Sequence, residues 1–106
     1  MIEMLQSKIH RITVTDANID YEGSITLSSG LIKQANLIKY QKVLVVDINN
    51  GNRFETYVID SSQNDIVCIN GAAARLVNIG DKIIIMSFSL FSEVPPDYKP
   101  TTVFFN

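Results

Sequence analysis

The chain has 106 residues, of which 46% are hydrophobic and 19% are charged, and its formal net charge is −2. This length fits one domain over residues 1–106 with no room for a second, and the hydrophobic content excludes a disordered chain. The absence of a Lys/Arg cluster excludes a nucleic-acid surface, and a single cysteine with a single histidine excludes an intramolecular disulfide and a His/Cys metal site within one subunit.

The N-terminal segment has the pattern of a strand with an irregularity. Ile12 and Val14 share one phase of the two-residue strand period, whereas Leu5 and Ile9 share the other. A flat strand turns only one of these sets toward a core, so it cannot bury both. We therefore expect a bulge or bend near residues 10–11.

One helix is expected after Ser28 or Ser29, either of which can cap its N-terminus. Apolar residues recur at helical spacing over positions 31–38, and Asn36 can adopt the left-handed conformation that ends a helix. These apolar residues are Leu31, Ile32, Ala35 and Ile38.

A hairpin is expected next. The segment Lys42–Asn49 is apolar and β-branched, and Arg53–Asp60 has the pattern of its return strand. Asn50-Gly51 between them is a strong signal for a two-residue turn.

The C-terminal half predicts two further strands, Asp65–Asn70 and Asp81–Phe91. The segment GAAARLVNIG between them predicts a short helical turn closed by Gly80, and the tail VFFN follows a Pro-rich connection as an edge strand. The predicted fold is therefore mainly β, a small barrel with one or two short helices.

The sequence also bears on location. Charges are scattered through the N-terminal segment, which lacks an apolar core of signal-peptide length. The longest apolar run, IIIMSFSLF, is too short to span a membrane. We therefore expect a cytoplasmic protein.

Four stretches contain candidate functional residues, and the first is Tyr21-Glu22-Gly23-Ser24. A Gly-Ser pair between strands is most often a turn. The alternative is that Gly23 permits a strained peptide whose carbonyl the Ser24 hydroxyl attacks. The residues alone leave both interpretations open.

The second stretch is the strand around Tyr57. Alternation places Arg53, Glu55 and Tyr57 on one face and Thr56 on the other. An arginine and a tyrosine on one face can hold a carboxylate and deliver a proton. A cross-strand salt bridge beside a half-buried tyrosine explains the same pattern.

The third stretch, Asn70 to Ala74, places small residues after a strand, where backbone N–H groups can approach an anion closely. A simple Asn-Gly turn is the alternative. The fourth holds Lys8 and His10 on one strand face, which exposed edge-strand charges explain equally well. Cys68 lies in a strand with a buried pattern, where an inert core thiol is expected.

Taken together and in order, these stretches resemble the aspartate 1-decarboxylase family. The matching segments run from about Met4 to Phe88 and include the final VFF. They are MLQSKIHRITVT, YEGSITL, NGNRFETY, INGAAARLVNIGD and IIIMSF.

The resemblance implies a double-psi β-barrel that assembles as a homotetramer with active sites at subunit interfaces. It also implies a zymogen that cleaves itself into a β chain, residues 1–23, and an α chain, residues 24–106. The Ser24 hydroxyl attacks the Gly23 carbonyl, and the resulting ester eliminates and hydrolyses to a pyruvoyl group. Some relatives need an acetyltransferase-like helper protein for this maturation, and the sequence leaves open whether this chain does.

The activity implied by the resemblance is decarboxylation of L-aspartate through a Schiff base with the pyruvoyl group. The product, β-alanine, serves pantothenate and coenzyme A biosynthesis. Tyr57 matches the proton donor and Thr56 matches the residue that polarises the cleaved carbonyl. Arg53 and Lys8 match cationic positions that bind the substrate carboxylate. The remaining matches are Asn70, Gly71, Ala72 and Ala73, which frame the intermediate, and His10 and Tyr21 near the site; no metal is implied.

Two other functions fit a small β-barrel. One is a non-catalytic module that binds anions or another protein, and the other is an inactive relative that has lost processing. A scaffold does not need the six matching side chains together, so their joint presence favours the enzyme. These six are Lys8, Ser24, Arg53, Thr56, Tyr57 and Asn70.

Overall fold

The computed structural model describes residues 1–106 and consists mainly of strands. A short α-helix and a short 3₁₀ helix, η1, complete it. The elements are β1 (Ile2–Thr13), β2 (Asp16–Asn18), β3 (Ser24–Ser28), α1 (Ser29–Gln34), β4 (Lys42–Asp47), β5 (Arg53–Ser61), β6 (Val67–Asn70), η1 (Gly71–Leu76), β7 (Lys82–Phe91) and β8 (Thr101–Phe104).

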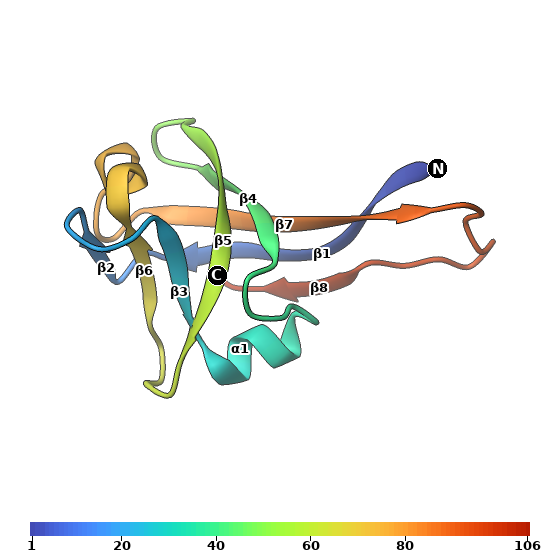
Figure 1. The fold of residues 1–106 in the computed structure, drawn as a ribbon, viewed down its shortest axis with the longest axis horizontal. Helices are drawn as coiled ribbons and strands as arrows, with labels where there is room; N and C mark the ends of the chain where they lie inside the picture. The colour runs from blue at the N-terminus through green and yellow to red at the C-terminus, as the bar shows by residue number, and fades with distance from the viewer.

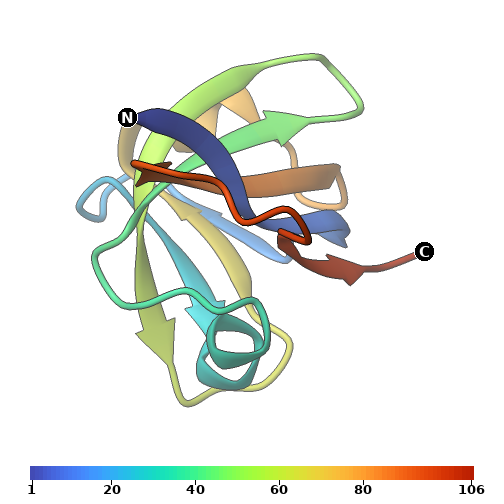
Figure 2. The same cartoon turned by 90° about the vertical axis from the view of Figure 1, so that its right-hand side faces the viewer.

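The eight strands form one sheet in the order β2-β6-β3-β5-β4-β7-β1-β8. β1 and β2 are consecutive in the chain but lie far apart in this order, and Thr15 between them donates its backbone N–H to the Val67 carbonyl at 2.9 Å. The chain thus runs from β1, which pairs with β7, to β2, which pairs with β6, and joins two distant parts of the sheet. Figure 1 shows β1 and β7 as a long pair with β3, β5 and β6 running across it, and Figure 2 shows the strands curving round a common interior. The predicted mainly β small barrel is confirmed.

The interior is filled by alternate residues of nearly every strand, as the two-residue period requires. Its core is a cluster of 17 buried apolar residues. Full burial of one isoleucine or leucine side chain contributes about 1.5–3 kcal/mol, so the largest of these dominate the stability of the barrel. They are Ile9, Ile25, Leu27, Ile69, Ile83 and Ile85.

The expected irregularity in the first strand is confirmed. Arg11 has a φ of 71°, and the register between β1 and β7 shifts between His10 and Ile12. This shift turns both Ile9 and Ile12 toward the core. A second shift, between Leu5 and Ser7, was not predicted.

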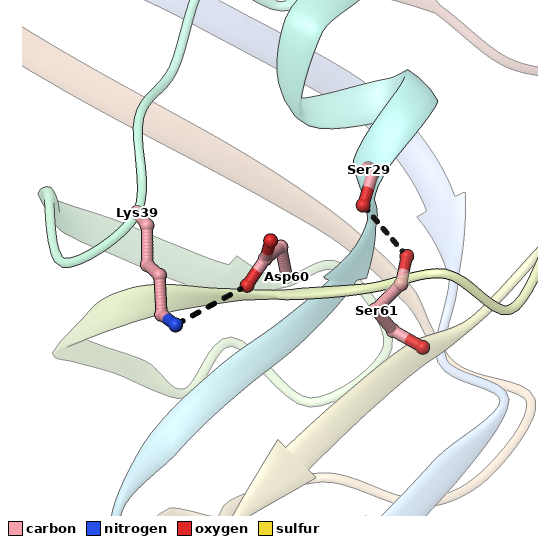
Figure 3. Close-up of polar contacts among 4 residues, drawn as sticks. All are labelled: Ser29, Lys39, Asp60 and Ser61. Carbon is pink, nitrogen blue, oxygen red and sulfur yellow. Dashed lines mark hydrogen bonds and ion pairs between the residues drawn. The ribbon is translucent and has the colours of Figure 1, made fainter.

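The helix is shorter than its pattern predicted. Asn36 does adopt a left-handed conformation, with a φ of 59°. The Ser28 hydroxyl makes no capping bond; it accepts the Ile66 N–H at 2.9 Å instead. The Ser29 hydroxyl donates to the Ser61 carbonyl at 2.9 Å, as Figure 3 shows. The prediction for Ile38 was wrong, because this residue follows the helix end and is 71% exposed.

The hairpin between β4 and β5 is confirmed, but its loop is longer than two residues. β4 ends at Asp47, whose Oδ1 accepts the N–H groups of Asn49 and Asn50 and so folds the chain before Gly51. The side-chain amides of Asn50 and Asn52 both donate to the Leu76 carbonyl at 2.9 Å. The loop is thereby fastened to the end of η1.

The strands predicted in the C-terminal half are confirmed with small shifts of boundary, but the prediction that Gly80 closes the helical turn was wrong, because η1 ends at Leu76. β6 begins at Val67 because Asp65 adopts a φ of 56°, and Gly80 with a φ of 98° lies in the turn before β7, beyond the end of η1. The tail strand β8 pairs in parallel with β1 at the sheet edge. No helix is long and apolar enough to cross a membrane.

The environment of Asp47 predicts that the stability of the folded protein depends on pH. It is fully buried, its Oδ2 has no hydrogen-bond partner, and burial together with the neighbouring Asp81 carboxyl raises its pKa. Lys82 does not neutralise it, since that ammonium group bonds Thr13 at 2.8 Å. A raised carboxyl pKa means that the folded state holds the proton more tightly. The stability that Asp47 contributes is therefore complete below the ordinary pKa of ~3.9 and is lost as pH rises through the raised value.

Asp47→Asn should remove this loss. The amide oxygen still accepts the loop N–H groups, while its nitrogen carries no charge and can donate to Asp81. We expect the variant to be about 1–3 kcal/mol more stable than the wild type at pH 8 and to lose that advantage toward pH 4. Urea unfolding at both pH values measures the difference. An advantage that is equal at both would contradict the proposed titration.

Candidate active site

Ser24 is the first residue of β3 and is 1% exposed. Its hydroxyl donates to the Glu22 carbonyl at 3.0 Å and accepts the side-chain amide of Asn70 at 3.0 Å. A hydroxyl that bonds the carbonyl two residues earlier is turned back along the chain, toward the peptide between Gly23 and itself. The Ser24 oxygen is therefore held by two hydrogen bonds, one to the chain just before Gly23 and one from the end of β6.

Asn70 reaches Ser24 because β3 and β6 are antiparallel and pair these two residues. It is 3% exposed and ends β6. Its Nδ2 also donates to Thr26 Oγ1 at 2.9 Å, and its Oδ1 lies 3.2 Å from the Cys68 sulfur. Sequence reasoning placed Asn70 at the site but did not identify Thr26 or Cys68 as its partners.

Gly71 lies against the predicted cleavage point. Its φ is +75°, and a Cβ built on it would meet the Cα and N atoms of Gly23 at 2.7 and 2.8 Å. A side chain at position 71 would push the Gly23 backbone away. Glycine is therefore needed both for the positive φ and for this close approach. Gly23 itself has open space around it, and its φ lies outside the left-handed region. The strain expected at Gly23 is therefore not visible in its φ.

A cavity of about 230 Å³ opens beside Ser24. The parallel pairing of β3 with β5 aligns Ile25 with Val58, and continuing that register by one residue places Ser24 next to Tyr57. Two residues far apart in the sequence thus meet at one cavity. Its lining residues are Tyr21, Glu22, Ser24, Lys39, Tyr40, Tyr57, Ile59 and Asp60.

Lys39, Tyr40 and Asp60 were not identified from the sequence. Lys39 forms an ion pair of 3.6 Å with Asp60, as Figure 3 shows, and its ammonium lies 5.1 Å from the centre of the Tyr40 ring. The Tyr40 ring in turn lies 6.2 Å from that of Tyr57. Because Asp60 neutralises Lys39, the cavity of one chain has no unpaired cation for an acidic ligand.

Thr56 lies on the opposite face of β5 from Tyr57, as expected, and is half-buried opposite Val43. Arg53 is exposed at the start of β5, four residues before Tyr57 and outside the cavity lining. Glu55, on the face of Arg53, pairs with Lys42 at 3.1 Å, so the predicted cross-strand salt bridge also exists.

Lys8 and His10 lie on β1, and β7, β4 and β5 separate that strand from β3 in the sheet. His10 packs edge-on against Phe104 with 5.8 Å between ring centres, and its Nδ1 is buried without a partner. Neither residue lines the cavity beside Ser24. Within one chain these residues are therefore separate from the other predicted site residues.

Ala72 and Ala73 lie in the first turn of η1, directly after Gly71. A larger cavity, of about 620 Å³, lies between α1, the chain before β6 and the C-terminal segment. None of the predicted site residues lines it. The chemistry expected from the sequence is therefore associated with the smaller cavity.

Comparison with known proteins shows the family of this chain. The sequence model of the family described as aspartate decarboxylase matches residues 1–106. An aspartate 1-decarboxylase of Clostridium novyi is 54% identical over 99% of this chain and 87% of its own length. Another, of Campylobacter fetus, is 56% identical over 99% of this chain and 92% of its own length. This chain belongs to the aspartate decarboxylase family.

Proposed function

We propose that this protein is an aspartate 1-decarboxylase, which converts L-aspartate to β-alanine and CO2. The single observation that carries the proposal is the placement of Ser24, which is buried at the edge of the cavity that Tyr57 lines. A decarboxylase of this family needs a reactive group at the position of Ser24 and a proton donor at the position of Tyr57. The match to the family over the whole chain supports the same activity.

We further propose that the chain cleaves itself between Gly23 and Ser24. The bond from Ser24 Oγ to the Gly23 carbonyl carbon forms while the bond from that carbon to the Ser24 nitrogen breaks, and the hydroxyl proton ends on the nitrogen. Asn70 supports this step because its amide holds the hydroxyl oxygen at 3.0 Å. Loss of the Ser24 α-proton then breaks the bond from Cβ to the ester oxygen, which releases the Gly23 carboxylate and leaves a dehydroalanine at position 24. Water hydrolyses this residue to a pyruvoyl group and releases its nitrogen as ammonia.

The residues around Ser24 fit this cofactor. Position 24 lies at the cavity, and the Asn70 amide supplies a hydrogen-bond donor beside it. The pyruvoyl carbonyl supplies an electron sink for the carboxylate that leaves as CO2. The Tyr57 hydroxyl can deliver a proton into the same cavity, and the turn at Gly71 to Ala73 can frame the substrate.

Intact mass spectrometry under denaturing conditions tests this function. We expect two fragments, residues 1–23 and 24–106, of which the larger has no free α-amine, and CO2 release from L-aspartate by the same sample. Cleavage of the purified chain alone would show that no helper protein is required. An intact chain that decarboxylates aspartate would refute the pyruvoyl mechanism, and a cleaved chain inactive on aspartate would refute the substrate.

The substrate site is proposed to be completed by a neighbouring subunit of a homotetramer. L-Aspartate carries two carboxylates, whereas the only cation lining the cavity of one chain is paired with Asp60. Lys8 and His10 lie on β1, which is separated from β3 by three strands of the sheet, and the adjoining strand β7 has exposed apolar residues such as Phe88 and Leu90. Association of subunits would bury these apolar residues and bring Lys8, with Arg53, to the substrate carboxylates.

Light scattering at micromolar concentration measures the assembly. We expect a tetramer, and we expect Leu90→Glu, which places a charge on the exposed apolar part of β7, to dissociate it and to remove activity. Lys99→Glu, a charge change at an exposed residue of the loop before β8, is the matched control. An active monomer would contradict a site shared between subunits.

A further inference from the structure

The side-chain amide of Asn70 has every polar atom engaged although it is buried. Nδ2 carries two N–H groups, and they are directed to Ser24 Oγ at 3.0 Å and to Thr26 Oγ1 at 2.9 Å. Oδ1 accepts from the Cys68 sulfur at 3.2 Å. Three neighbours on β3 and β6 therefore determine how this amide is turned.

A flipped amide would be much less favourable here. It would place Oδ1 opposite Ser24, whose only hydroxyl proton is already directed to the Glu22 carbonyl. It would also turn Nδ2 toward Cys68, leaving the thiol hydrogen without an acceptor. The orientation thus depends on a donor at position 68 and an acceptor at position 26.

Cys68 is suited to be this donor because its thiol stays protonated. Burial raises the pKa of Cys68, and the charge of Asp16 raises it further. A thiolate could only accept a hydrogen bond and would repel Oδ1, whereas the neutral thiol is a weak donor. The buried cysteine, expected from the sequence to be inert, therefore has a specific hydrogen-bonding role.

We propose that Cys68 and Thr26 are positioning residues for self-cleavage: by fixing the Asn70 amide they hold the Ser24 hydroxyl toward the Gly23 carbonyl. This inference rests on the proposed function, because it concerns the rate of the same cleavage. Neither residue touches the reacting atoms. Their effect is exerted through Asn70, which contacts the Ser24 oxygen directly.

The test compares Cys68→Ala with Cys68→Ser and Thr26→Val with Thr26→Ser in the full-length chain. Intact mass spectrometry follows the fraction cleaved with time after purification. Cys68→Ala and Thr26→Val each remove one hydrogen-bond partner of the buried amide, so we expect cleavage to slow by about threefold to tenfold. Cys68→Ser replaces the thiol donor by a hydroxyl donor, and Thr26→Ser keeps the hydroxyl acceptor, so both should cleave within about twofold of the wild type.

Thermal melting of all four variants separates positioning from general stability. A merely structural role would slow cleavage in proportion to the loss of Tm, irrespective of which group remains. If Cys68→Ala does not fold, the comparison of Thr26→Val with Thr26→Ser provides the same test. Wild-type rates in both Cys68→Ala and Thr26→Val, or equally slow cleavage in the serine variants, would overturn the inference. A wild-type chain that never cleaves would instead refute the proposed function.

Discussion

Ser24→Ala is expected to leave an intact chain of 106 residues with no measurable decarboxylation of L-aspartate. The ester intermediate requires an oxygen on the side chain of residue 24, and alanine has none. Alanine is smaller than serine and fits the same position, which is 1% exposed. Intact mass spectrometry measures the chain, and a CO2 assay measures the activity.

Ser29→Ala is the matched control for this loss. Its hydroxyl lies on the first residue of α1, directly after the strand that begins with Ser24, and makes one exposed hydrogen bond to the Ser61 carbonyl. Removal of that bond should cost at most about 1 kcal/mol of stability and leave cleavage unchanged. Normal decarboxylation by Ser24→Ala would rule out a cofactor derived from Ser24. Loss of cleavage in Ser29→Ala would show that cleavage responds to any disturbance of the strand.

The strands themselves could be predicted because their periodicity is strong. The conflict of phase between Leu5 and Ile12 correctly predicted the bulge marked by the positive φ of Arg11. The length of the hairpin loop could not be predicted, because it depends on the Asp47 carboxylate binding two loop N–H groups. Local turn preferences were overridden there by one buried side chain.

The candidate site was predicted only in part. Sequence alternation separated Thr56 from Tyr57, but nothing local indicates that β3 runs parallel to β5 and so places Ser24 near Tyr57. Asp60 reaches the cavity on β5, and Lys39 reaches it from the loop before β4, where Tyr40 donates its backbone N–H to the Val58 carbonyl at 2.7 Å. Such residues come from separate segments whose contact depends on the order of strands in the sheet, which no short motif encodes.

Tyr57→Phe and Thr56→Val should separate turnover from self-cleavage, since the two residues lie on opposite faces of β5. Tyr57→Phe keeps the aromatic ring beside Tyr40 and removes only the hydroxyl from the cavity. We expect normal cleavage and a fall in turnover of about 10²–10⁴-fold, the usual contribution of a positioned acid. Mass spectrometry reports the cleavage, and the CO2 assay reports the turnover.

Thr56→Val should have the opposite effect, because it keeps the shape of the side chain and removes the hydroxyl proposed to polarise the Gly23 carbonyl. An amide carbonyl attacked by a hydroxyl develops negative charge, and loss of one donor to such an oxyanion typically costs about 10²–10³-fold in rate. The variant should accumulate as uncleaved chain. Any fraction that does cleave should turn over at the wild-type rate, since Tyr57 is intact. An uncleaved Tyr57→Phe, or a Thr56→Val that matures normally, would show that these adjacent residues do not serve separate steps.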